Sequence, residues 1–191
     1  YLLMAGFKGP IFTSIASASL LPLVIEDALK VGVTRDQKII DTCLRLLKQQ
    51  IIEVDFKAWF ELPCKGEHIA KARLQRAGHI LGSAYVEIDI SIPTRKAKNC
   101  HRVVFSGDLG APYTPLLPAP KAPYKADTLV IESTYGDKNH QGRKQRTQTL
   151  KAVIERAVAD NGIVLVPAFS IGRTQELLYE LEQLIHASTK N

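Results

Sequence analysis

The sequence predicts an α+β protein, and three patterns along the chain indicate it. Two segments near the N-terminus carry apolar residues at helical spacing, the middle of the chain alternates apolar and polar residues, and the C-terminal part alternates short apolar runs with helical segments. The chain has 191 residues, 46% of them hydrophobic and 23% charged, which fits one globular domain or the larger part of one. Intrinsic disorder is therefore excluded.

A short strand followed by two helices is expected at the N-terminus. Residues 11–13 are apolar and β-branched, and they lead into an apolar run at helical spacing. Pro22 is compatible with that helix if Ser17 or Ser19 caps it, because the missing N–H then falls in the first turn. A second helix, apolar on one face and charged on the other, is expected over 35–50.

Antiparallel strands are expected within 59–105. Segments 70–75 and 86–92 alternate apolar and polar residues, which is typical of half-buried strands. A basic polar turn at 95–99 predicts a hairpin between the second and third strands, and its tip is most simply solvated charge. Five prolines within 112–123 exclude regular structure there, and such loops usually cover something.

The C-terminal part is expected to alternate strand and helix. Residues 128–131 form a short apolar run that predicts a buried strand, and a helix is expected over 150–158, ended by Asn161-Gly162. A second buried strand is expected at 163–166. The last element is a helix over 177–185.

Three expected strands run directly into clusters of glycine with an acid or a histidine, at 78–83, 105–110 and 131–137. Loops at the rim of a rigid sheet are a common place for ligand-binding side chains. In the first cluster, His79 stands between two glycines and offers a ring nitrogen to a transition metal. A lone histidine is more often a core or surface residue, so both interpretations stay open.

Two carboxylates are candidates for the same chemistry. Asp108 lies between Gly107 and Gly110, where it can bridge two metal ions or simply cap a turn. Glu132 ends an apolar strand, where a buried acid requires a metal or a histidine partner. A plain surface glutamate is the other interpretation of Glu132.

A fourth cluster, 167–173, lies between an expected strand and the start of a helix. Free N–H groups at a helix N-terminus, with the Ser170 hydroxyl and the Arg173 guanidinium beside them, make a phosphate site. An ordinary helix capped by Ser170, with Arg173 solvated, is the alternative.

Charge and cysteine content favour an anionic partner and a reducing compartment. The net charge is +6 and the pI is about 9.2, which leans toward partners such as nucleic acid. The three cysteines lie far apart with no CxxC spacing, so reduced thiols and a cytoplasmic location are expected. No stretch reaches the roughly 18 apolar residues of a spanning helix, so we expect a soluble protein without a membrane partner.

Taken together and in order, segments 78–83, 105–110, 131–137 and 167–178 resemble the metallo-β-lactamase-fold nucleases of the β-CASP group. That group includes the endonuclease subunit of the eukaryotic pre-mRNA 3′-end cleavage machinery and bacterial and archaeal RNA-processing homologues. Four motifs in register carry the resemblance, which covers nearly the whole chain.

The resemblance implies an αββα sandwich. Residues 1–140 would be a partial metallo-β-lactamase-like domain, and 141–191 would be the start of a β-CASP cap domain. The family's His-x-His-x-Asp-His motif would precede Tyr1, and the cap-domain histidines would follow Asn191. Residues 1–191 are therefore expected to be a fragment that is inactive, binds zinc poorly and self-associates, with a homodimer as one arrangement.

The resemblance also implies zinc-dependent hydrolysis of RNA phosphodiester bonds, internal or from an end, by the intact protein. Two zinc ions would activate a bridging hydroxide. His79 would be a zinc ligand and Asp108 the carboxylate that bridges both ions. Glu132 would orient a cap-domain histidine that acts as general acid.

Single-stranded RNA is the expected substrate, and the candidates for binding it are Ser170, Gly172 and Arg173. A catalytically inactive scaffold that binds nucleic acid and a DNA-directed nuclease of the same group are the alternatives. A small-molecule hydrolase is disfavoured, because 132–136 and the helix start at Gly172-Arg173 resemble the polymer-cleaving group.

Overall fold

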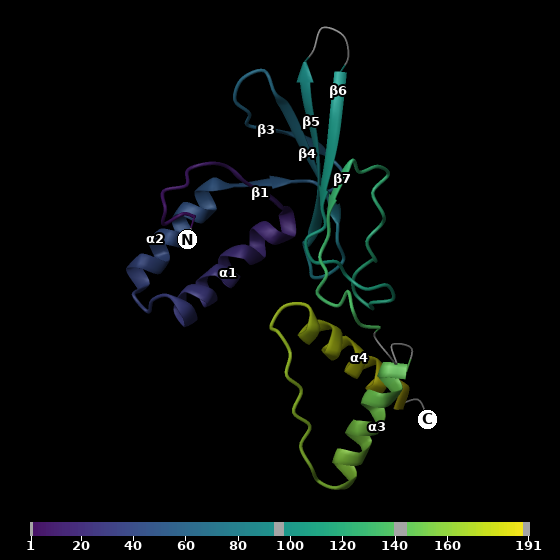
Figure 1. Ribbon diagram of the computed structural model, residues 1–191. Helices are drawn as coiled ribbons and strands as arrows, with labels where there is room; N and C mark the ends of the chain where they lie inside the picture. The colour runs from purple at the N-terminus through teal and green to yellow at the C-terminus, as the bar shows by residue number, and fades with distance from the viewer. Residues whose placement is uncertain (1, 94–97, 140–144, 189–191) are drawn as a thin grey trace.

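The structure is a computed structural model that describes residues 2–93, 98–139 and 145–188. It contains a two-stranded parallel sheet and a five-stranded sheet with strand order β3-β4-β5-β6-β7 (Figure 1). The mixture of α and β elements is as the sequence predicts. In chain order the elements are β1 (Ile11–Ser14), α1 (Ile15–Gly32), α2 (Gln37–Gln50), β2 (Ile51–Val54), β3 (Trp59–Leu62), β4 (Ile69–Arg76), β5 (Ala84–Pro93), β6 (Lys98–Phe105), β7 (Thr128–Val130), α3 (Arg146–Ala159) and α4 (Arg173–Ser188).

The N-terminal layer consists of β1 and β2 with α1 and α2 (Figure 1). The Ser14 hydroxyl caps α1 by accepting a hydrogen bond from the Ser17 N–H at 3.2 Å. The expected cap at Ser17 or Ser19 is therefore wrong, because the helix follows β1 without a break. Pro22 lies beyond the first turn of α1, where it removes one backbone hydrogen bond from the helix interior.

The middle of the chain forms the expected antiparallel strands. Ala72 of β4 pairs with Ile88 of β5, and the next pair is Arg73 with Glu87. Directly paired residues share a face of a sheet, so one face is apolar and the other is charged. The hairpin between β5 and β6 is confirmed, whereas residues 94–97 of its expected basic tip lie outside the described residues.

The apolar face of the five-stranded sheet packs toward the N-terminal layer. Phe12 of β1 and Phe60 of β3 have ring centroids 4.7 Å apart. Ala72 and Leu74 are buried on the same face, and Ile40 of α2 is fully buried. The hydrophobic core thus lies between the two sheets and beneath the helices.

The opposite face carries an ion-pair network. Arg102 of β6 donates from Nε and Nη2 to the two oxygens of Asp89, at 2.6 and 2.8 Å. Arg73 pairs with the buried carboxylate of Glu87. Both guanidinium groups lie over the ring of Trp59, that of Arg73 at 4.5 Å and that of Arg102 at 5.3 Å from the ring centroid. The aromatic face therefore stabilises both positive charges.

The C-terminal part departs from the sequence expectation at two strands. β7 pairs in parallel with β6, but its Leu129 and Val130 are exposed rather than buried. The strand expected at 163–166 is wrong: the segment has no strand structure, and Ile163 is 86% exposed. A strand needs a neighbouring strand to pair with, and this segment has none among the described residues.

The two C-terminal helices contact each other and lie beyond one end of the five-stranded sheet (Figure 1). Helix α3 continues to Ala159, and Asn161 follows it with a φ of 51°, as the expected helix end requires. Only α1 and α2 form a helical layer on the sheets within the described residues. The second helical layer of an αββα sandwich is therefore not formed by this part of the chain.

Two further features concern the helices and the cysteines. Within the described residues no helix combines the length and the apolar character needed to cross a membrane. Cys43, Cys64 and Cys100 are free thiols.

Candidate functional site

The loop after β4 holds His79. The N–H of Ala77 bonds to the carbonyl of Ser83 at 3.0 Å and closes the loop. The Ser83 hydroxyl accepts the backbone N–H groups of His79 and Ile80, at 3.0 and 3.2 Å. The backbone around His79 is thus fixed by its own loop while the imidazole is exposed to solvent.

The loop after β6 holds Asp108 and is bonded to the His79 loop. The Gly110 N–H donates to the carbonyl of Ala77 at 2.7 Å. A Cβ atom on Gly110 would overlap the carbonyl of Gly78, so only glycine permits this approach of the two loops. The glycines that the sequence places in both clusters therefore have a defined structural role.

The imidazole and the carboxylate meet at the rim of the sheet. Nε2 of His79 lies 3.9 Å from Oδ2 of Asp108, and both side chains are open to solvent. The two residues come from different strand ends. The structure brings an imidazole nitrogen and a carboxylate oxygen, two atoms that can bind a metal ion, close to each other.

Glu132 lies two residues after the end of β7 and bonds to the loop that carries Asp108. Its Oε1 accepts the Leu109 N–H at 2.6 Å, and its Oε2 accepts the Thr134 hydroxyl at 2.7 Å. Its own N–H donates to the Ser106 hydroxyl at 3.0 Å. The hydrogen bond from the Leu109 N–H, followed by the one from the Thr134 hydroxyl, holds the pKa of the Glu132 carboxyl below its usual range, so the group is ionised at neutral pH. Glu132 is half-buried, between the buried acid and the plain surface glutamate that the sequence leaves open.

The fourth cluster lies against the His79 loop. A Cβ atom on Gly172 would stand 2.8 Å from Cγ2 of Ile80, so the segment before α4 touches the residue that follows His79. The side chain of Gln175 accepts the Gly172 N–H at 2.7 Å and donates to the Ser170 carbonyl at 2.9 Å, so it caps the start of α4.

Arg173, the first residue of α4, is paired within its own helix. Its Nη1 lies 2.9 Å from Oε2 of Glu176, and the side chain is 65% exposed. The structure thus places Gly172 beside the His79 loop, while the Arg173 guanidinium is available at the surface and carries one salt bridge.

His79 and Asp108 are two side chains that could hold a metal ion together. The described residues hold no group of three or more His, Cys, Asp or Glu side chains arranged to bind one ion. Bonds from zinc to imidazole nitrogen and carboxylate oxygen are about 2.0–2.2 Å. His79 Nε2 and Asp108 Oδ2, 3.9 Å apart, are therefore within reach of one ion but cannot complete its four-coordinate shell.

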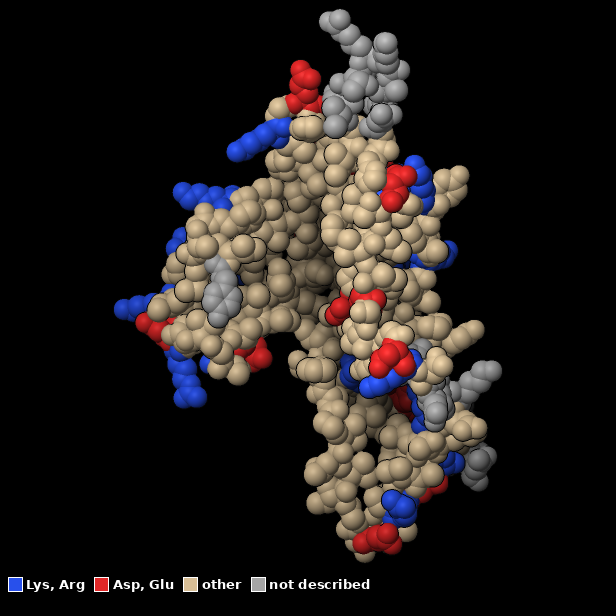
Figure 2. Space-filling model, in the orientation of Figure 1, with Lys and Arg blue, Asp and Glu red and all other residues tan. Residues whose placement is uncertain are grey.

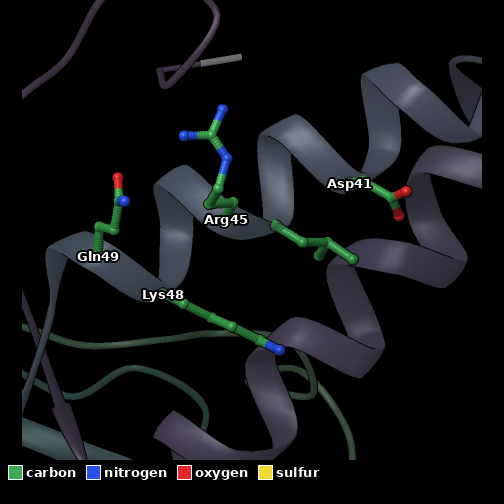
Figure 3. A pocket seen from close by; sticks show the side chains of 5 residues that line it. Asp41, Arg45, Lys48 and Gln49 are labelled. Carbon is green, nitrogen blue, oxygen red and sulfur yellow. The ribbon is translucent and has the colours of Figure 1, made fainter.

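Two surface features lie apart from these donors. A pocket of about 420 Å³ on α2 is lined by Asp41, Leu44, Arg45, Lys48 and Gln49, and its Lys48 side chain extends toward α1 (Figure 3). It contains none of the predicted site residues.

Figure 2 shows basic and acidic side chains interspersed on the face drawn, so the basic residues do not form one continuous basic surface there.

The sequence missed the residues that hold the site together. Ser83, Ser106 and Thr134 bond to the loops of His79 and Asp108 or to Glu132. Each hydroxyl lies within one of the glycine clusters, and this was the available signal. Their partners could not be assigned from spacing alone.

Comparison with known proteins identifies relatives over more than nine tenths of the chain. It is 30% identical to "Ribonuclease TTHA0252" of Thermus thermophilus over 181 aligned residues, and the alignment covers 92% of this chain and 37% of that protein. It is 30% identical to "Cleavage and polyadenylation specificity factor subunit 3" of Dictyostelium discoideum, covering 93% of this chain and 22% of the relative. It is 32% identical to "Transcription termination factor FttA" of Pyrococcus abyssi, covering 92% and 26%. No family model matches the chain.

This homology confirms the resemblance that the four motifs carry. The chain is a relative of the metallo-β-lactamase-fold nucleases of the β-CASP group. It spans between about a fifth and two fifths of the length of these three curated relatives.

Proposed function

We propose that the full-length protein containing these residues hydrolyses phosphodiester bonds of single-stranded RNA with the help of two zinc ions. The observation that carries the proposal is the approach of His79 Nε2 and Asp108 Oδ2 to 3.9 Å, on two loops joined by the Gly110 to Ala77 hydrogen bond. The name of one relative, a ribonuclease, supports RNA as the substrate.

His79 and Asp108 would hold the metal from this part of the chain, and Asp108 has two oxygens with which to bridge two ions. A bound zinc pair supplies a deprotonated water near neutral pH and positive charge opposite the phosphate. The remaining ligands would come from outside the described residues, because those residues hold no group of three or more such side chains and two ligands do not complete a zinc site.

Glu132 would orient a histidine from outside this chain that protonates the leaving oxygen. Its carboxylate is ionised and accepts one hydrogen bond on each oxygen. A carboxylate oxygen has two lone pairs, so each oxygen retains capacity for one further donor. Glu132 can thus hold the Asp108 loop and a histidine at the same time.

Ser170, Gly172 and Arg173 would bind the RNA backbone. The segment containing Gly172 touches Ile80, next to His79. Arg173 is exposed, and its single salt bridge to Glu176 is of the exposed helical kind that contributes little stability. The guanidinium can therefore exchange Glu176 for a phosphate at small energetic cost. In this proposal residues 1–140 form the metal-binding domain and 141–191 begin a cap domain.

A nucleic-acid-binding scaffold without catalysis is the second candidate, and a DNA-directed nuclease is the third.

One assay separates the three candidates. The zinc-loaded full-length protein is incubated with labelled single-stranded RNA and with DNA of the same base sequence, beside Asp108→Ala and the control Asp27→Ala, an exposed acid on α1. Cleavage of RNA alone that is lost in Asp108→Ala but not in Asp27→Ala supports the proposal. Cleavage of DNA alone supports the DNA nuclease. Binding without cleavage by the zinc-loaded wild type supports the scaffold.

A further inference from the structure

The loop that holds His79 is attached to α1 by two serine hydroxyls. Ser14 Oγ lies 2.7 Å and Ser17 Oγ lies 3.0 Å from the carbonyl oxygen of Gly82. Each hydroxyl has one proton to donate, and a carbonyl oxygen has two lone pairs, so both serines can bond to it together. We call this pair of contacts the serine clamp.

The clamp is partly buried and closely packed. Ser14 is 2% exposed, and it also accepts the Ser17 N–H as the cap of α1. Gly82 has a φ of 85°, and a Cβ atom on it would stand 2.6 Å from the Ser17 hydroxyl and 2.7 Å from the Ser17 nitrogen. No larger residue fits between the loop and the helix at this position.

The clamp acts on the part of the loop that fixes His79. Gly82 is followed by Ser83, whose hydroxyl accepts the N–H groups of His79 and Ile80 and whose carbonyl accepts the N–H of Ala77. Holding the Gly82 carbonyl therefore limits where Ser83 can lie, and Ser83 in turn limits the backbone of His79. The helix start and the backbone of His79 are linked through two consecutive sets of hydrogen bonds, which the Gly82–Ser83 peptide joins.

We propose that Ser14 and Ser17 are positioning residues for His79: they fix its loop and thereby set the direction of its imidazole toward Asp108. The inference rests on the proposed function in so far as the imidazole is a zinc ligand. Groups that orient a metal ligand without touching the metal typically contribute about 10- to 100-fold in metal affinity.

Ser17→Ala is the most informative variant. It removes one hydroxyl from Gly82 but leaves Ser14 in place as the cap of α1, so the helix start is preserved. Ser14→Ala removes the cap and the other half of the clamp. Ser17→Thr retains the hydroxyl and should restore wild-type behaviour. Ser19→Ala is the matched control, because that hydroxyl bonds only to the Ile15 carbonyl within the same helix.

Two measurements on the full-length protein test the inference. The first is hydrogen–deuterium exchange of residues 77–83 in the zinc-free protein. The second is the zinc dissociation constant from competition with a chelator, accompanied by the visible spectrum of the cobalt-substituted protein. The thermal midpoint of each variant is recorded beside them.

We expect Ser17→Ala to exchange faster over 77–83, to bind zinc about tenfold more weakly and to alter the cobalt spectrum, with a thermal midpoint close to that of Ser19→Ala. Zinc affinity and exchange unchanged from wild type in Ser17→Ala would overturn the inference, whatever Ser14→Ala does. If the wild type binds no zinc, the proposed function fails. In that case the exchange measurement still tests whether the serine clamp holds the loop. Faster exchange over 77–83 in Ser17→Ala supports this role of the clamp, and unchanged exchange overturns it.

Discussion

The backbone N–H of Leu109 donates to Oε1 of Glu132 at 2.6 Å, so an acid after β7 holds the loop that carries Asp108. The same carboxylate accepts a hydrogen bond from the Thr134 hydroxyl. The backbone N–H of Glu132 donates to the Ser106 hydroxyl at the other end of the loop. Within the described residues, Glu132 thus acts on Asp108 through the backbone and not by direct contact.

Two substitutions at Glu132 separate this structural role from the proposed role in proton transfer. Glu132→Ala removes the acceptor for Leu109 and is expected to weaken zinc binding by about tenfold or more. Glu132→Gln retains an oxygen acceptor but loses the negative charge, so zinc affinity should stay near wild type while RNA cleavage falls. The measurements are a chelator competition and a cleavage rate for each variant. Equal zinc affinities in the two variants would contradict the role of Glu132 in holding the loop.

The contact between Gly110 and Gly78 predicts a strong effect of one methyl group. Gly110→Ala places a Cβ atom where the Gly78 carbonyl lies, which must separate the two loops. We expect faster amide exchange of residues 77–83 and a loss of zinc affinity. Gly32→Ala is the control, since nothing lies within 4 Å of a Cβ atom there and the residue ends α1. A Gly110→Ala protein that matches Gly32→Ala in both measurements would show that the loops can separate without consequence.

Asp89 predicts the acid sensitivity of the sheet. Its hydrogen bonds from Arg102 lower the pKa of the Asp89 carboxyl below the ordinary value, against the opposing effect of burial. The stabilisation is fully present above the unfolded-state pKa of about 3.9 and is lost as the pH falls through the lower folded-state pKa. Urea unfolding from pH 7 down to pH 2 should show this loss in wild type.

Arg102→Ala removes both hydrogen bonds to the Asp89 carboxylate and leaves that largely buried charge with the Lys71 ammonium at 3.9 Å, at a cost of about 3 kcal/mol in unfolding free energy at pH 7. Because the Arg102 hydrogen bond is the largest cause of the lowered pKa of Asp89, and burial opposes it, the variant should lose stability less steeply with acid than wild type. Parallel stability curves for the two proteins would contradict this account of the ion pair.

The exposed apolar segment at 163–166 predicts association of the isolated piece. Leu165 is 87% exposed and Ile163 is 86% exposed, and the edge strand β7 presents Leu129 and Val130. Residues 1–191 alone should therefore associate in light scattering, and Leu165→Lys should reduce the average mass. Val31→Lys, at an exposed apolar residue on α1, is the matched control. A monomer at high concentration in the unsubstituted chain would refute the expectation.

Local patterns were sufficient for much of the fold. The alternation along 70–75 and 86–92 predicts strands whose paired residues do share faces, because the side-chain period of a strand is two. The glycine clusters around His79 and Asp108 predict loops at strand ends, and the structure places both there. These features depend on neighbours in the sequence.

Features that depend on distant partners could not be predicted. The serine clamp joins Ser14 to Gly82, which are 68 residues apart. The segment 163–166 has the composition of a strand, but pairing requires another strand beside it, and the described residues provide none. The cap of α1 was placed too late because Ser14 belongs to both the strand and the helix start.

The central claim is that His79 and Asp108 hold zinc together, and elemental analysis of the full-length protein tests it most directly. We expect about two zinc ions per chain in wild type and in Asp27→Ala, with clearly fewer in His79→Ala and Asp108→Ala while all four proteins remain folded. Zinc content that is the same in all four, or a folded wild type that contains no zinc after incubation with the metal, would contradict it.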